Sequence, residues 1–164
     1  MMYRITQLIG LLAGLLLLTA CQSLSNGGAE LTAAQIAALK QEGFIQSDEG
    51  WEFSANEKLL FGTNEATLLP SARQTVDRIT RLLVSMDIVN VRVDGHTDAT
   101  GSVTYNEQLS RRRAQVVADE MLASGMPASG VRVRGVGSRL PVASNQSVEG
   151  RAQNRRVVLV VGTG

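Results

Sequence analysis

An apolar segment at the start of the chain ends at the only cysteine, and this feature limits how much of the sequence is left to fold. Residues 8–20 are all apolar or small, and Arg4 is the one charged residue before Glu30. Such a run is too short to span a bilayer as a helix, but it has the length of the apolar core of an export signal. Because Cys21 is alone, a disulfide framework and a cysteine-rich zinc site are excluded.

The residues around Cys21 resemble a bacterial lipobox, in which small residues form a cleavage site directly before a cysteine that becomes acylated. Here Leu18-Thr19-Ala20 precedes Cys21. The resemblance implies that residues 1–20 are a signal peptide and that acyl chains on Cys21 anchor the chain in a membrane. Gln22 follows in place of an aspartate, which favours the outer membrane. The alternative is a simple secretory signal with an unrelated cysteine.

Charge divides the remaining sequence into an acidic arm and a basic part. Residues 22–57 carry one lysine and six carboxylates, whereas residues 58–164 carry 14 basic and 9 acidic residues. Over the whole chain 16 basic residues nearly balance 15 acidic ones, so no strong field points to nucleic acid. The basic run 111–113 has no interleaved aromatic residues, and we therefore expect no nucleic-acid partner.

The arm contains one helix signal and most of the aromatic residues. Thr32 stands three residues before Gln35, the spacing of a capping box, and Gly43 stands where a helix C-terminal cap belongs. The pattern predicts a helix over Thr32–Glu42, which is too short to be stable alone in water. For the aromatic residues after it, packing over the edge of the domain is the alternative to partner binding. The candidate partner-binding residues are Leu39, Phe44, Trp51 and Phe53.

Beyond the arm, strand and helix patterns alternate. The predicted elements are a strand at Lys58–Phe61, a helix from Pro70 to Met86, a strand at Asp87–Val93, a helix at Tyr105–Ser124, and strands at Val131–Gly135 and Arg156–Val161. The last strand is valine-rich and almost uncharged, which predicts a central place in the sheet. The order β-α-β-α-β-β predicts an α+β, two-layer sandwich with both helices on one face of a mixed sheet. We expect a signal peptide at 1–20, an acylated cysteine and acidic arm at 21–54, and one domain at 55–164.

The residues most suited to binding chemistry lie between the second strand and the second helix. Asp98 follows the strand beside Gly101, where a carboxylate can accept backbone N–H groups and stay ionised. Arg113 shares the apolar face of the helix, so its guanidinium must be paired, and Asp98 is the nearest candidate partner. Two interpretations stay open. The pair is a structural salt bridge, or it holds a zwitterion, with an ammonium on Asp98 and a carboxylate on Arg113.

Two other chemistries compete with this one. Asp94, His96 and Asp98 alternate and would offer a metal one imidazole and two carboxylates, but nearby glycines break the alternation and no second histidine exists. An enzyme would need a nucleophile with its base, a metal, or two carboxylates of different pKa. Ser110 has no histidine nearby in sequence, and no glutamate accompanies Asp98 in its loop. We therefore expect no metal, no cofactor and no catalytic activity.

The pattern resembles the signature of OmpA-like, Pal-type peptidoglycan-binding domains, over roughly residues 55–162. The matching residues are Gly95-His96-Thr97-Asp98, Gly101, Tyr105-Asn106, Leu109-Ser110, Arg113-Ala114, Val117, Gly135-Val136-Gly137, Pro141-Val142-Ala143, Asn145, Gly150-Arg151 and Asn154-Arg155-Arg156-Val157. The resemblance implies non-covalent binding of the diaminopimelate side chain of the cell wall. It implies that Asp98 pairs with the amine and Arg113 with a carboxylate of that side chain. Asn106, Asn64 and Gly101 are further candidates for ligand contact.

The arm resembles that of a family of outer-membrane signalling lipoproteins. The matching segments are Leu31–Ile36, Gln41–Phe44, Asp48–Phe53 and Leu60–Gly62. This resemblance implies that the chain sequesters a periplasmic repressor, which frees an inner-membrane diguanylate cyclase and raises cyclic-di-GMP. On this hypothesis the packed arm holds the domain near the membrane, and the released arm allows wall binding and exposes an apolar surface to the repressor. A purely structural tether between outer membrane and wall is the alternative.

Overall fold

Five strands form one sheet in the computed structural model of the protein, which describes residues 30–61 and 67–162. The strands are β1 (Ile45–Ser47), β2 (Gly50–Asn56), β3 (Val91–His96), β4 (Val131–Gly137) and β5 (Arg156–Val161). Across the sheet their order is β1-β2-β5-β3-β4. Only β3 and β4 pair in parallel, and the other neighbours are antiparallel. The predicted mixed sheet is therefore confirmed.

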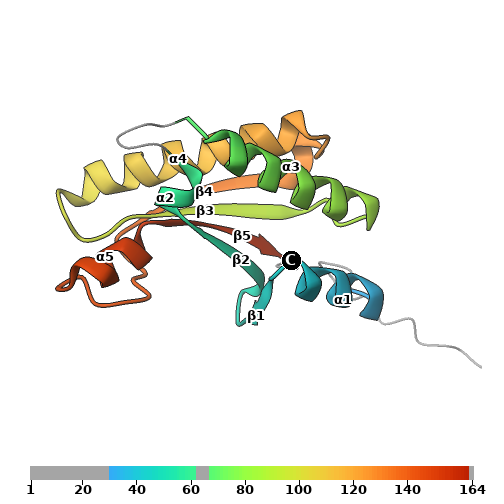
Figure 1. The fold of residues 1–164 in the computed structure, drawn as a ribbon, viewed down its shortest axis with the longest axis horizontal. Coiled ribbons are helices and arrows are strands. Elements are labelled where there is room, and N and C mark those ends of the chain that lie inside the picture. Colours follow the sequence, from blue (N-terminus) through green and yellow to red (C-terminus); the bar gives the residue numbers. More distant parts are fainter. Residues whose placement is uncertain (1–29, 62–66, 163–164) are drawn as a thin grey trace, which may run out of the picture.

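Two long helices cover one face of this sheet (Figure 1). The helices are α1 (Ala33–Gln41), α2 (Glu57–Leu60), α3 (Pro70–Ser85), α4 (Val103–Ala123) and α5 (Val148–Asn154), and Ala128–Gly130 forms a 3₁₀ turn. The two long ones, α3 and α4, pack side by side above the strands, as predicted. Within the described ranges, every helix is too short or too polar to cross a membrane.

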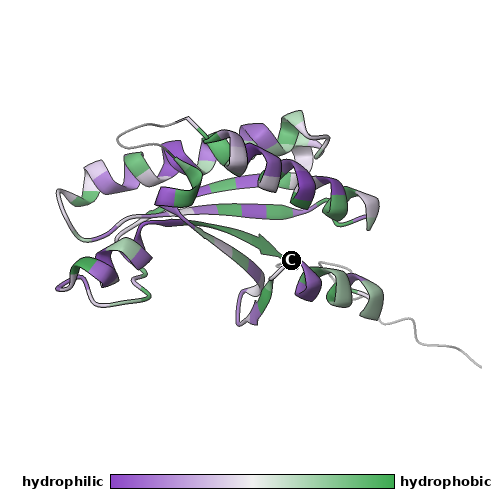
Figure 2. Cartoon of the chain, viewed as in Figure 1, coloured by the Kyte–Doolittle hydropathy of each residue, from purple (hydrophilic) through white to green (hydrophobic). Residues whose placement is uncertain are grey.

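Strand β5 lies at the centre of the sheet and is buried on both faces. Val157, Leu159 and Val161 belong to the core under α3 and α4, and Val158 and Val160 are buried on the opposite face. Figure 2 shows the strand in hydrophobic colours along most of its length. The predicted central position is confirmed, because a strand buried on both faces requires an almost uncharged sequence.

The prediction of a strand at Lys58–Phe61 is wrong. A helical turn, α2, takes its place, and Phe61 makes only an isolated bridge. Asn56 starts this turn because its side chain accepts a hydrogen bond from the Lys58 amide at 2.9 Å. The strand lies earlier, in β2, whose alternate side chains face the core: Trp51, Phe53 and Ala55.

The strand predicted at Asp87–Val93 begins later, at Val91. Asp87 has a φ of 56°, and the Ile88 amide donates to the Leu83 carbonyl at 2.8 Å, so the residues before β3 close α3. Helix α5 has no counterpart in the prediction, although the Ser147 hydroxyl caps it by accepting from the Gly150 amide at 3.0 Å.

The arm packs into the same core as the sheet. Both bonds of the predicted capping box are present in α1, from the Gln35 amide to Thr32 Oγ1 at 3.3 Å and from the Thr32 amide to Gln35 Oε1 at 2.8 Å. Gln35 Nε2 also donates to the Met86 carbonyl at 2.7 Å, which ties α1 to the end of α3. The expected division at residues 54–55 falls inside β2, so arm and domain share one core.

Ion pairs also connect the acidic arm to the basic part of the chain. Glu42 pairs with Arg78, and Glu49 pairs with Arg92 and, at 3.2 Å, with Arg134. Exposed pairs of this kind contribute at most about 1 kcal/mol each. Burial of an apolar side chain contributes about 1.5–3 kcal/mol. The apolar contacts of the arm are therefore the stronger part of its attachment.

Candidate ligand-binding site

The loop between β3 and α4 holds Asp98 in a fixed position. Asp98 Oδ1 accepts from the Thr100 amide at 2.9 Å. Asn106 Nδ2 donates to the Thr100 carbonyl at 3.0 Å and to the Asp98 carbonyl at 3.3 Å. Gly101, with a φ of 92°, turns the chain into α4 in a conformation that favours glycine. The structure thus brings together three predicted site residues, Asp98, Gly101 and Asn106. The side-chain amide of Asn106, however, donates its hydrogen bonds to the loop backbone.

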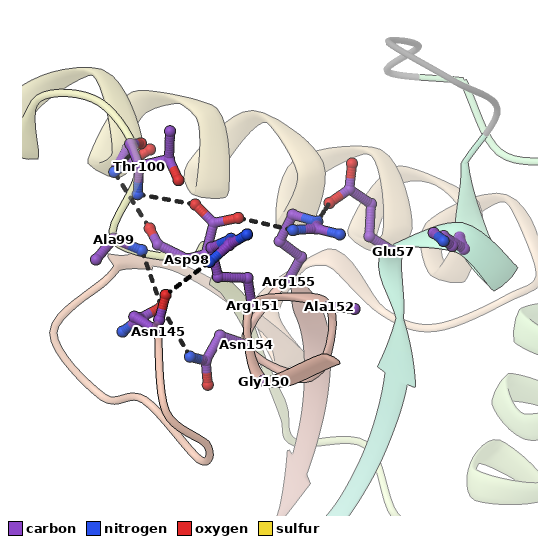
Figure 3. Close-up of polar contacts among 12 residues, drawn as sticks. Glu57, Asp98, Ala99, Thr100, Asn145, Gly150, Arg151, Ala152, Asn154 and Arg155 are labelled. Atoms are coloured by element: carbon purple, nitrogen blue, oxygen red, sulfur yellow. Dashed lines mark hydrogen bonds and ion pairs between the residues drawn. The ribbon is translucent and has the colours of Figure 1, made fainter. Parts of the chain in front are cut away.

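Arg155 is the guanidinium that neighbours Asp98. Its Nη1 donates to Asp98 Oδ2 at 2.7 Å, and its Nε lies 3.1 Å from Glu57 Oε2 (Figure 3). Burial of Asp98 favours the neutral acid, but hydrogen bonds from Arg155 and Thr100 outweigh it and hold the pKa of Asp98 below its ordinary value. The carboxylate therefore stays ionised at neutral pH.

Arg113 pairs with Glu57, so the prediction that Asp98 is its partner is wrong. Arg113 Nη2 donates to Glu57 Oε1, and its guanidinium carbon lies 5.9 Å from the centroid of the Phe61 ring. The side chain is 11% exposed, and its Nε has no hydrogen-bond partner among the described residues. The physical reason for the correction is that Arg155 and Glu57 fill the space between the two predicted partners.

The four charges form a row in which the sign alternates: Asp98, Arg155, Glu57 and Arg113. Each of these largely buried charges therefore has an opposite neighbour, and the row is formally neutral. Its members come from the β3–α4 loop, the residue between α5 and β5, the start of α2 and the middle of α4. Such a row can offer a carboxylate at one end and a guanidinium at the other to a ligand that carries both charges.

A buried asparagine fixes the loop at residues 140–147 beside the Asp98 loop. Asn154 Oδ1 accepts from the amides of Val142 and Ala143 at 2.8 and 3.0 Å. Its Nδ2 donates to Asn145 Oδ1 at 2.9 Å, and that oxygen also accepts from the Ala99 amide at 3.1 Å (Figure 3). The site thus rests on a satisfied polar network.

The OmpA family model matches residues 60–155 of the sequence. The chain belongs to the OmpA family. This OmpA family chain is similar to the outer-membrane lipoprotein YfiB of Pseudomonas aeruginosa PAO1, with 48% identity over 131 residues, covering 80% of this chain and 78% of that one. It is 40% identical over 149 residues to the lipoprotein YfiB of Escherichia coli K12, covering 90% and 91% of the two chains.

A solved structure supports the same fold. The cell wall anchor of the T6SS from Pseudomonas aeruginosa superposes with a TM-score of 0.65 at 28% identity, over 84% of this OmpA family chain and 100% of that one. The resemblance read from the sequence motifs and the expected two-layer α+β fold are therefore confirmed.

The other predicted residues of this OmpA family chain are either outside the described residues or in the arm. Asn64 and Cys21 lie outside the described residues. Lys40 Nζ of α1 lies 5.5 Å from the centroid of the Trp51 ring, over which it stands. The partner-binding candidates are buried or half-buried in the core: Leu39, Phe44, Trp51 and Phe53. Leu39, Phe44 and Trp51 are buried, so a partner can contact them only if the arm is displaced, whereas Phe53 is half-buried.

Asp94 and Ser110, the residues considered for a metal site and for catalysis, make hydrogen bonds to other groups of the protein in the part of the chain that the structure describes. Asp94 accepts hydrogen bonds from Arg92 Nε at 3.0 Å and from Arg134 Nη2 at 2.5 Å, so its oxygens serve guanidinium groups. No group of three or more His, Cys, Asp or Glu side chains in residues 30–61 and 67–162 could hold a metal ion. Ser110 is fully buried, donates to the Glu107 carbonyl at 2.9 Å and accepts from the Gly137 amide at 3.0 Å.

His96 is a buried, neutral side chain at the end of β3. Burial lowers its pKa to about 3, and the positive charges of Arg156 and Arg134 act in the same direction. The unfolded chain takes up a proton near pH 6.5 while the folded chain does not, so stability falls as the pH decreases below that value.

We expect the free energy of unfolding to decrease by about 1.5 kcal/mol between pH 6.5 and pH 5 because of His96 alone. Urea unfolding at several pH values measures this loss. The His96→Gln variant cannot take up the proton and should show a flatter pH dependence over this interval. An identical slope in both proteins would contradict the assignment of a neutral, buried imidazole.

Proposed function

We propose that this chain is an outer-membrane lipoprotein that binds peptidoglycan non-covalently through the free end of diaminopimelate. The observation that carries the proposal is the row of charges, with an ionised Asp98 at one end and Arg113, which keeps an unpartnered N–H, at the other. The free end of diaminopimelate carries one ammonium and one carboxylate. An ion pair with Asp98 and a forked hydrogen bond from Arg113 would bind both groups.

Each site residue has a role in this proposal. Asp98 takes the amine and Arg113 takes the carboxylate. Asn106 and Gly101 hold the loop that positions Asp98, and Asn64 is a further candidate contact. The family match over residues 60–155 and the likeness to a cell wall anchor support the proposal. The site contains no nucleophile placed with a base in the described residues, and we propose binding without catalysis.

Co-sedimentation with purified peptidoglycan tests this function. The detergent-solubilised full-length protein should pellet with the wall and should stay in the supernatant without it. Recovery of the protein in the supernatant in both cases would contradict the proposal.

We further propose a signalling role, because the similarity to the two YfiB lipoproteins extends through the arm. In this role the chain sequesters the periplasmic repressor YfiR and thereby releases the diguanylate cyclase YfiN, which raises cyclic-di-GMP. The alternative is a structural tether between outer membrane and wall. A pull-down from periplasmic extract separates the two, because the signalling role requires a soluble partner that is captured with the arm present and lost when the arm is deleted.

Anchoring in the outer membrane depends on Cys21 in this proposal. Each acyl methylene in the bilayer contributes about 0.8 kcal/mol, so several chains give a stable anchor without a membrane-spanning helix. The Cys21→Ser variant should take up no labelled palmitate and should leave the membrane fraction or stay uncleaved. Undiminished palmitate labelling of that variant would contradict the lipoprotein assignment.

A further inference from the structure

Glu57 forms an ion pair with the guanidinium of Arg113, the group that binds the carboxylate of the proposed ligand. Its Oε1 accepts from Arg113 Nη2, and its Oε2 lies 3.1 Å from Arg155 Nε. The Glu57 side chain is 18% exposed, and the backbone holds it in place, because the Glu57 amide donates to the Arg155 carbonyl at 2.9 Å. A carboxylate of the protein itself therefore stands where a carboxylate of the ligand would bind.

Glu57 and the carboxylate of the ligand can bind Arg113 together only at a cost in binding free energy. Both are acceptors with negative charge, and a second carboxylate beside Glu57 would be repelled in a site that is shielded from water. Exposed ion pairs are weak because water competes with them, but Arg113 is only 11% exposed, so this pair is only weakly screened. Entry of the ligand therefore requires Glu57 to give up Arg113 at least in part.

We propose that Glu57 is an internal competitor for Arg113 that lowers the affinity of the site for the carboxylate of the ligand. The inference rests on the proposed function, since it assigns that carboxylate to Arg113. Loss of the Glu57 charge frees the guanidinium and leaves Asp98 paired with Arg155. The apparent dissociation constant equals the intrinsic one divided by the fraction of molecules in which Arg113 is available. If Arg113 is available in about one tenth of the molecules, making it available in all of them strengthens binding about tenfold.

Calorimetric titration of the detergent-solubilised full-length protein tests the inference. The probe is the soluble tripeptide L-Ala-γ-D-Glu-meso-diaminopimelate, and the variant is Glu57→Gln, which keeps the shape of the side chain and removes its charge. We expect the variant to bind this tripeptide about tenfold more tightly than the wild type. The same tripeptide with lysine in place of diaminopimelate keeps the amine and lacks the carboxylate, so its binding should show no such gain.

A matched control separates a local effect from the change in net charge. Glu120 lies on α4 and pairs with Arg73 at 3.6 Å, away from the row of charges. Glu120→Gln alters the net charge by the same amount and should leave both affinities at their wild-type values.

The outcomes distinguish this inference from the function on which it rests. If the wild type binds the diaminopimelate tripeptide and Glu57→Gln binds it equally or less tightly, the competitor role is wrong and the proposed function stands. An equal gain for the lysine tripeptide, or for Glu120→Gln, also overturns the competitor role. If neither the wild type nor Glu57→Gln binds the diaminopimelate tripeptide, both proposals are wrong. Binding that is detected only with Glu57→Gln supports both.

Discussion

Replacing Asp98 or Arg113 by alanine is expected to abolish co-sedimentation with peptidoglycan. Removal of one member of a hydrogen-bonded charge pair at a binding interface costs about 2–5 kcal/mol, which corresponds to at least about a thirtyfold loss of affinity. In Asp98→Ala the amine of the ligand loses its counter-charge, and Arg155 loses its 2.7 Å partner. In Arg113→Ala the carboxylate of the ligand loses both forked donors.

The matched control for these variants is Arg112→Ala. Arg112 precedes Arg113 on α4 and is exposed to solvent. Its removal changes the net charge by the same amount as removal of Arg113 but should leave co-sedimentation unchanged. Circular dichroism checks that each variant is folded. A folded Asp98→Ala protein that sediments like the wild type would show that the ligand binds elsewhere.

Replacing Leu39 by proline is expected to release the arm and to raise both YfiR capture and cellular cyclic-di-GMP. Proline inside α1 lacks the amide hydrogen of the helix and clashes with the preceding turn, at a cost of about 3 kcal/mol or more. Leu39 is also fully buried, and loss of such a side chain costs a further 2–5 kcal/mol, roughly. Without α1, the ring of Trp51 loses the Lys40 side chain that stands over it.

Two further variants control this experiment. Leu39→Met keeps the helix and nearly the same side-chain volume, so it should behave like the wild type. Adding Trp51→Ala to Leu39→Pro removes part of the surface that release exposes and should reverse the gain. If Leu39→Pro is present at the wild-type level and raises neither quantity, the arm is a spacer and the structural tether is favoured.

The regular elements of the basic part were predictable because they repeat a local pattern. The apolar stripe after Pro70, the valines of β5 and the long helix before Gly125 each give a strong periodicity over one element. Strand β2 was missed even though Trp51, Phe53 and Ala55 alternate. Its aromatic residues follow the helix of the acidic arm, and their pairing with β5 depends on residues about a hundred positions away.

The candidate site was predictable only in part, for a related reason. Asp98 and Arg113 stand out locally, one at the end of a strand and the other on the apolar face of a helix. Glu57 and Arg155 complete the row of charges, but they join the site only when α2 and the end of α5 meet beside α4. No spacing in the sequence indicates that meeting. A requirement that every buried charge be paired indicated that Arg113 had a partner but did not identify it.

We propose that the row of charges from Asp98 to Arg113 recognises the free end of diaminopimelate. Comparison of two types of cell wall tests this recognition. Peptidoglycan with lysine in place of diaminopimelate keeps the side-chain amine and lacks the side-chain carboxylate. The full-length protein should sediment with diaminopimelate-type peptidoglycan and stay in solution with lysine-type peptidoglycan. Equal sedimentation with both would show that Arg113 has no part in recognition and that the row does not select the carboxylate of diaminopimelate.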